Sequence, residues 1–115
     1  MIDHVDMTDS SAAAAFAALG SASRVALLRL LVRAGTDGMN VSQLREAIGT
    51  PATTLTHHLG KLVEAGLVTQ QRRGRELRCR ADYPVIRAIG AFLMEDCCAG
   101  VFDARGEVCC SATTD

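Results

Sequence analysis

The chain contains few aromatic residues: no tryptophan, one tyrosine and three phenylalanines among 115 residues. Its apolar residues are mainly alanine, leucine and valine, a composition that favours helices. A chain of this length forms one small domain around a single hydrophobic core. We therefore expect a mainly helical domain that covers part of its remaining apolar surface by forming a dimer.

A long hydrophobic run is also missing. The longest apolar stretch, residues 12–19, is far too short to cross a bilayer, and the N-terminus is acidic and has no basic leader. These absences predict a cytoplasmic protein without a membrane partner. Because thiols stay reduced in the cytoplasm, the five cysteines are expected to be ligands, redox sensors or core residues. The chain has no Cys-x-x-Cys motif, which argues against a small thiol enzyme.

No strong excess of charge of either sign marks the whole chain, but one segment is basic. The net charge is −1, whereas residues 60–80 hold six basic and two acidic side chains, a local charge of +4. The rest of the chain has six basic and eleven acidic residues. A basic patch on an acidic body is typical of proteins that bind specific DNA sites.

Two helices are predicted in the first third of the chain, and both serve as scaffold. Ser10 and Ser11 can cap an alanine-rich helix. Ser21 caps a second helix over residues 22–34, in which leucines and valines repeat at helical spacing and which Gly35 ends.

A helix-turn-helix motif is predicted next. Asn40 or Ser42 caps a short helix that Gly49 ends. Thr50 caps a fourth helix, with Pro51 in its first turn. Two helices separated by such a Gly-Thr-Pro turn form a helix-turn-helix.

The fourth helix has an apolar face and an opposite face rich in threonine and histidine. Leu55, Leu59 and Leu62 share one sector of this helix. Short hydroxyls and imidazole suit base edges and phosphates in the major groove, where the N-terminal residues of a recognition helix make contact. The predicted DNA contacts on this helix are Thr53, Thr54, Thr56, His57 and Lys61.

The adjacent histidines, His57 and His58, are poorly placed to chelate one metal ion. Neighbouring side chains on a helix diverge by about 100°, and no third ligand is near in sequence. We assign DNA contact to His57 and a half-buried, hydrogen-bonded structural role to His58.

A β-hairpin follows, made of two β-prone stretches, residues 67–72 and 75–80, that are joined at Gly74. In the second stretch apolar residues alternate with arginines, so one face is apolar and the other cationic. Cys79 shares the apolar face and is expected to be a small core residue. The hairpin is a wing that contacts phosphates or the minor groove. Its predicted DNA contacts are Arg72, Arg73 and Arg75.

The last helix is predicted to start near residue 82 and to carry a strong apolar stripe. Such a terminal helix often packs against its copy in a dimer. Ile89, Leu93 and Cys97 follow one another at four-residue spacing. We therefore expect the helix register to place the Cys97 thiol against the dimer face.

Two adjacent cysteine pairs, Cys97-Cys98 and Cys109-Cys110, supply four thiols within fourteen residues. The residues between the pairs include glycine and charged side chains, so the thiols are difficult to explain by core packing. We expect a site for a soft ion. Residues 1–98 are assigned to a winged helix-turn-helix domain for DNA binding and dimerisation, and residues 99–115 to a flexible cysteine-bearing tail.

Four segments of the sequence occur together in a pattern typical of one protein family: LGSASRVALL at 19–28, TLTHHLGKL at 54–62, EAGLV at 64–68, and the Arg-Gly-Arg tip of the wing. Together they resemble the ArsR/SmtB family of winged-helix transcriptional repressors. The resemblance implies a homodimer that binds double-stranded operator DNA and dissociates when a metal or metalloid binds. It also implies that the chain is not an enzyme.

Both common sensor sites of that family are missing from the sequence. Residues 40–45 contain no cysteine where some arsenic sensors have a Cys-x-Cys pair, and residues 84–96 contain no histidine for a zinc site. Residues 95–100 instead resemble arsenite-responsive members with a vicinal pair at the end of the last helix and a third cysteine shortly beyond. That third position falls near Asp103 here, so Cys109 or Cys110 would have to fold back.

The chemistry of the thiols favours a metalloid. Trivalent arsenic or antimony prefers three thiolates, and soft ligands select soft ions. Zinc or cadmium would take four thiolates in a tetrahedron, and thiol oxidation is a further alternative. We expect a repressor that is released when As(III) or Sb(III) binds. The expected ligands are Cys97 and Cys98 together with Cys109 or Cys110.

Overall fold

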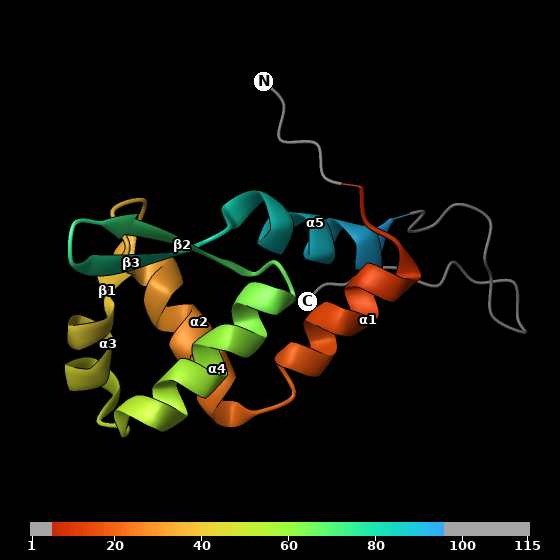
Figure 1. The fold of residues 1–115 in the computed structure, drawn as a ribbon. Helices are drawn as coiled ribbons and strands as arrows, with labels where there is room; N and C mark the ends of the chain where they lie inside the picture. The colour runs from red at the N-terminus through yellow and green to blue at the C-terminus, as the bar shows by residue number, and fades with distance from the viewer. Residues whose placement is uncertain (1–5, 96–115) are drawn as a thin grey trace, which may run out of the picture.

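The computed structural model describes residues 6–95 (Figure 1). It contains five helices and three strands, with the sheet and the first helix at opposite ends and α2 and α4 between them (Figure 1). The elements are α1 (Asp9–Ala18), α2 (Ala22–Ala34), β1 (Met39–Asn40), α3 (Val41–Ile48), α4 (Ala52–Glu64), β2 (Val68–Arg73), β3 (Glu76–Ala81) and α5 (Tyr83–Met94). The predicted winged helix-turn-helix, mainly helical with a β-hairpin, is confirmed.

The ends of α2 and α3 agree with the sequence. The Ser21 hydroxyl accepts a hydrogen bond from the backbone N–H of Arg24, and Gly35 ends α2 with a φ of +82°. Of the two predicted caps for α3 it is Asn40 that serves, because its side chain accepts from the backbone N–H of Gln43 at 2.8 Å. These caps pair backbone N–H groups that have no partner inside the helix.

Two predicted caps are wrong. Thr8, not Ser10 or Ser11, caps α1: it forms a capping box with Ser11, whose hydroxyl accepts from the backbone N–H of Thr8. Thr50 does not cap α4, because Pro51 occupies the cap position with extended backbone and offers no side-chain acceptor. The cap of α1 thus lies two or three residues before the expected position, and that of α4 one residue after it.

The sheet has a third strand that the sequence did not predict. Its order is β1-β3-β2, with Met39 opposite Cys79 and Asn40 opposite Arg78. Gly38 makes this approach possible, because a Cβ at this position would lie 2.1 Å from the carbonyl oxygen of Cys79. A strand of two residues is too short to show the alternation by which strands are recognised.

The hydrophobic core joins the helix-turn-helix to the wing. Its largest fully buried side chains come from α2, α3, α4, β2 and β3 and from the turn before β2; they are Leu27, Leu31, Leu44, Leu55, Leu62, Leu67, Val68 and Cys79. Cys79 thus has the core position expected for it. Because α4 and the base of the wing share one core, they are held in a fixed arrangement.

The last helix, α5, continues directly from the wing. The Asp82 carboxylate caps it by accepting from the backbone N–H of Val85 at 3.3 Å. Ile89 is buried in the core, whereas Leu93 and Met94 are 62% and 61% exposed. The helix ends at Met94, where Glu95 takes an extended ψ of 138°. Cys97, predicted to continue the row of Ile89 and Leu93, lies outside the described residues.

The predicted boundary after residue 98 and the tail at 99–115 lie outside the described residues. Within residues 6–95, no single helix has the length and apolarity needed to cross a membrane; α1 and α2 meet that test only as a pair, and they are bent by 101°.

Candidate nucleic-acid interface

The polar face of α4 is open to solvent along its length. Leu55, Leu59 and Leu62 point into the core and are at most 2% exposed, which turns the opposite side of the helix outward. All five predicted DNA contacts of this helix are exposed: Thr53, Thr54, Thr56, His57 and Lys61. The structure therefore brings these five side chains onto one accessible helix.

The start of α4 leaves backbone donors available. Pro51 makes no side-chain cap hydrogen bond, and the first backbone N–H with a partner inside the helix belongs to Leu55, which donates to the Pro51 carbonyl at 3.0 Å. Uncapped N–H groups at a helix start attract anions such as phosphate. This end of α4 suits the DNA backbone as well as the neighbouring base edges.

The tip of the wing carries the three predicted arginine contacts. Arg72, Arg73 and Arg75 are exposed, and Gly74 forms the turn between them with a φ of +62°. Arg73 makes one weak contact, a 3.4 Å hydrogen bond to the Gln71 side chain. The tip therefore presents cationic side chains that can rearrange to meet phosphates.

The other two arginines of the wing behave differently. The Arg78 guanidinium donates to the Glu76 carboxylate at 2.8 and 2.9 Å and to the carbonyl oxygen of Asp37 at 3.1 Å. Arg80 donates to the carbonyl oxygen of Thr36 at 3.5 Å. The cationic face predicted for the second strand is thus turned toward the loop between α2 and β1 and fastens that loop to the wing.

Glu76 and Asn40 complete this network; the sequence had indicated Asn40 only as a possible helix cap and had not singled out Glu76. The Asn40 amide donates to the second carboxylate oxygen of Glu76 at 3.2 Å. The pKa of the Glu76 carboxyl lies below its usual value of 4.5, first because of its hydrogen bonds from Arg78 and second because of that from Asn40. The available signal was Glu76 itself, the single acidic residue in the basic stretch 67–80.

His58 has the structural role predicted for it. Its ring is half-buried, and Nδ1 lies 3.4 Å from a guanidinium nitrogen of Arg24. The Arg24 guanidinium also donates to the carbonyl oxygen of Ala18 at the end of α1. This contact connects the recognition helix to α1 and α2.

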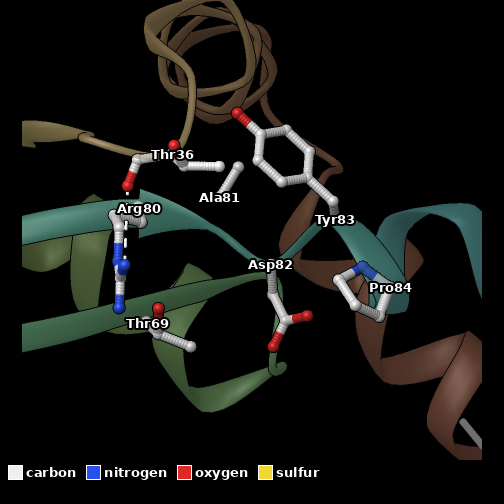
Figure 2. Close-up of a pocket in the computed structure, with 7 residues that line it drawn as sticks. All are labelled: Thr36, Thr69, Arg80, Ala81, Asp82, Tyr83 and Pro84. Atoms are coloured by element: carbon white, nitrogen blue, oxygen red, sulfur yellow. Dashed lines mark hydrogen bonds between the residues drawn. The ribbon is translucent and has the colours of Figure 1, made fainter. Parts of the chain in front are cut away.

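A pocket of about 230 Å³ marks the junction of the wing, α5 and the loop after α2 (Figure 2). The Tyr83 hydroxyl at the start of α5 donates to the carbonyl oxygen of Val32 in α2 at 3.0 Å. The backbone N–H of Asp82 donates to the carbonyl oxygen of Leu67, just before β2. The first turn of α5 is therefore tied both to α2 and to the wing.

The predicted thiol ligands, Cys97, Cys98, Cys109 and Cys110, lie outside the described residues. Inside them, no three His, Cys, Asp or Glu side chains are close enough together to hold a metal ion. Cys79 is 0% exposed. Burial raises the pKa of its thiol above the ordinary 9.0, and the hydrogen bond from Gln70 opposes this less strongly.

A family model described as a helix-turn-helix domain matches residues 19–71, which extend from the end of α1 into β2. An ArsR-like transcriptional regulator from Rhodococcus sp. RHA1 is 28% identical, with a TM-score of 0.65 over 73% of this chain and 76% of that one. No curated protein matches the chain.

Two further solved structures share the fold. One is a homodimeric winged helix-turn-helix DNA-binding domain from Mycobacterium bovis, a possible ArsR-family regulator; it is 23% identical, with a TM-score of 0.62 over 79% of this chain and 88% of that one. The other is the transcriptional repressor BigR from Xylella fastidiosa, which is 24% identical, with a TM-score of 0.59 over 74% of this chain and 85% of that one.

These relatives are transcription regulators and not enzymes, in agreement with the expectation from the sequence. None of these proteins, nor the family model, is described as binding arsenic or antimony. The helix-turn-helix match and the shared fold show that the chain is a winged helix-turn-helix protein similar to ArsR-like transcriptional regulators.

Proposed function

We propose that this chain is a cytoplasmic transcriptional repressor that binds operator DNA as a homodimer and leaves it when As(III) or Sb(III) binds its C-terminal thiols. One observation carries the DNA-binding part: the uncapped start and the threonine-histidine face of α4 are exposed on the same rigid unit as the arginine tip of the wing. Such a surface offers short donors for a groove and cations for the flanking phosphates.

In the proposed complex, the N-terminal half of α4 enters the major groove. Thr53, Thr54, Thr56 and His57 contact base edges and nearby phosphates, and Lys61 contacts the backbone. Arg72, Arg73 and Arg75 bind phosphates or the minor groove beside it, which supplies affinity and salt dependence more than sequence specificity.

The proposed dimer rests on apolar surface that the single chain leaves uncovered. Leu93 and Met94 are about three-fifths exposed at the end of α5, and Phe16 on α1 is 42% exposed. Large apolar side chains in such positions are typical of surfaces between subunits. The relative from Mycobacterium bovis is homodimeric, which supports the same state for this chain. A two-fold dimer would present its two recognition helices to successive turns of DNA.

The inducer part of the proposal depends on the thiols of Cys97 and Cys98, with Cys109 or Cys110 as third ligand. Three thiolates are the preferred coordination of trivalent arsenic and antimony. Zinc or cadmium on all four thiols, or oxidation of the thiols, are the alternatives. Cys79 is not counted among the ligands, because its sulfur is enclosed in the core.

The junction at residues 82 and 83 supplies a route from the thiols to the DNA. Ligation next to the end of α5 would displace this helix, and the Tyr83–Val32 and Asp82–Leu67 hydrogen bonds would pass the displacement to α2 and the wing. In a dimer this movement changes the spacing of the two recognition helices. A shift of a few kcal/mol between the two states is sufficient for release.

The test compares the wild-type protein with the variant Cys97→Ser/Cys98→Ser, both reduced, in mobility-shift titrations against promoter DNA. Both should bind DNA equally without metalloid, and arsenite or antimonite should release the wild type alone. If the variant is released at the same arsenite concentration, the proposed site is wrong. Release of the wild type by zinc, cadmium or peroxide, but not by arsenite, would establish one of the alternatives.

The third ligand is identified by the single variants Cys109→Ser and Cys110→Ser, which form a matched pair. The one that provides a ligand should raise the arsenite concentration needed for release, and the other should leave it unchanged. Equal behaviour of both variants and the wild type would remove this pair from the site.

A further inference from the structure

Glu76 is an acidic residue in the middle of the surface proposed to bind DNA. A carboxylate near phosphates weakens binding by charge repulsion, so its presence between Arg75 and Arg78 calls for a compensating role. Its side chain is about one-third exposed, and both carboxylate oxygens are engaged by neighbours.

The contacts of Glu76 connect three separate elements. One oxygen accepts from Arg78, which also donates to the carbonyl oxygens of Asp37 and Gly38 in the loop after α2. The other oxygen accepts from the Asn40 side chain, whose own oxygen caps α3. One carboxylate thus fastens the base of the wing tip to the loop and to the first turn of the helix-turn-helix.

Because of its position in the hairpin, Glu76 can affect the orientation of the arginine tip. It is the first residue of β3, paired with Arg73 across the strand and separated from it by the two-residue turn Gly74-Arg75. A short hairpin tip has few restraints of its own beyond the ladder hydrogen bonds. The direction of Arg73 and Arg75 relative to α3 and α4 therefore depends on how the end of β3 is held.

We propose that Glu76 is a positioning residue for DNA binding: through Asn40 and Arg78 it holds the arginine tip of the wing in register with the recognition helix. This inference rests on the proposed DNA binding. It predicts that removing a negative charge from the basic surface weakens binding, which is the opposite of what simple electrostatics predicts.

The test uses a duplex that the wild-type protein selects from a random-sequence pool. Glu76→Gln keeps the shape of the side chain but loses the charge-assisted bonds, and should weaken binding about tenfold, within the range for coupled neighbouring residues. The matched control is Glu46→Gln on the exposed side of α3. Within the described residues the Glu46 carboxylate makes no hydrogen bond or ion pair, so loss of its charge should leave binding equal or slightly tighter.

Two further measurements separate positioning from loss of stability. Asn40→Ser keeps a good α3 cap and removes only the amide donor, so it should weaken binding in the same direction as Glu76→Gln. In the Glu76→Gln background, Arg73→Ala should cost much less affinity than in the wild type, because the arginine is already misplaced.

The outcomes are distinguishable. Failure of the wild type to enrich any DNA sequence overturns the proposed DNA binding and the role of Glu76 with it. Enrichment by the wild type, combined with a Glu76→Gln variant that binds as tightly as Glu46→Gln, overturns the role of Glu76 alone. The role of Glu76 is also overturned if the losses of affinity caused by Glu76→Gln and Arg73→Ala simply add in the double variant. The effect of Glu76→Gln would then not act through the position of Arg73.

Discussion

Cys79 shows how one residue of a reactive type is made inert. Its side chain is completely enclosed, and its backbone pairs with Met39 on one side and Gln70 on the other. Burial protects the sulfur in two ways: it keeps reagents away, and by raising the pKa it keeps the thiol protonated. The protonated thiol is unreactive, because the thiolate is the reactive form.

We expect Cys79 to resist a thiol reagent at about pH 8 while the protein is folded. Denaturation in guanidinium should then release one additional reactive thiol per chain, and Cys79→Ala should abolish this difference. Reaction of all thiols of the folded wild type at one common rate would contradict the core position of Cys79.

The same thiol should make stability depend on pH in the alkaline range. The pKa of Cys79 is higher in the folded than in the unfolded chain, so the folded state binds more protons between the two values. The contribution of the protonated thiol is complete below the ordinary pKa of 9.0 and is lost as pH rises above it. The contribution is measured by urea unfolding of the wild type and of Cys79→Ala at about pH 8 and pH 10. Between these two pH values the free energy of unfolding should fall more for the wild type than for the variant.

At the scale of elements, α4 and the wing have different parts in the proposed DNA binding. The exposed histidine of α4 suits base edges, whereas the arginine tip suits phosphates. The core leucines of α4, spaced at three and four residues, made its orientation predictable from the sequence alone.

His57→Ala and Arg73→Ala should both weaken operator binding, but in different ways. Loss of His57 should reduce discrimination between operator and random DNA by about 1–3 kcal/mol if it contacts a base. Loss of Arg73 should weaken both DNAs and lower the slope of log affinity against log salt by about 1 for each phosphate contact removed. Fluorescence anisotropy over a salt series measures both effects.

Arg29→Ala is the matched control for the arginine, since Arg29 is also exposed but lies on α2, outside the helix-turn-helix and wing. It should leave the affinity and the salt slope unchanged. Unchanged affinity for both His57→Ala and Arg73→Ala would exclude the proposed docking surface.

The helix ends show where prediction by element succeeds and where it fails. Ser21 was identified because it is the acceptor just before a clear apolar repeat, whereas Asn40 was one of two candidates, Asn40 and Ser42, between which the sequence did not choose. Around α1 several acceptors compete, and six of its ten residues are alanine, so no clear apolar repeat selects among them. Thr50 does not cap α4 because the following proline occupies the cap position and has no side-chain acceptor.

At the scale of the whole molecule, the exposed end of α5 is the clearest sign of assembly. Leu93→Glu should weaken dimerisation by more than about tenfold, since it would place a charge in an apolar interface. Leu93→Met keeps an apolar side chain of similar volume and should leave the dimer intact. Sedimentation equilibrium measures the dimer constant, and operator binding should fall together with it.

A monomeric wild type, or a Leu93→Glu variant that dimerises as well as Leu93→Met, would show that α5 does not form the interface. Retention of full operator affinity by a monomeric variant would instead contradict the paired arrangement of recognition helices.

The sequence by itself determined the helices, the hairpin and the inward and outward faces of α4, because these depend on local propensity and on periodicity along the chain. Only the tertiary structure decided the third strand and the partners of Arg78 and Glu76. Each of these depends on contacts between residues far apart in sequence, such as Asn40 with Glu76, which no local pattern encodes. The basic stretch that looked uniform in the sequence is therefore divided in space, with Arg72, Arg73 and Arg75 facing solvent and Arg78 and Arg80 holding the wing in place.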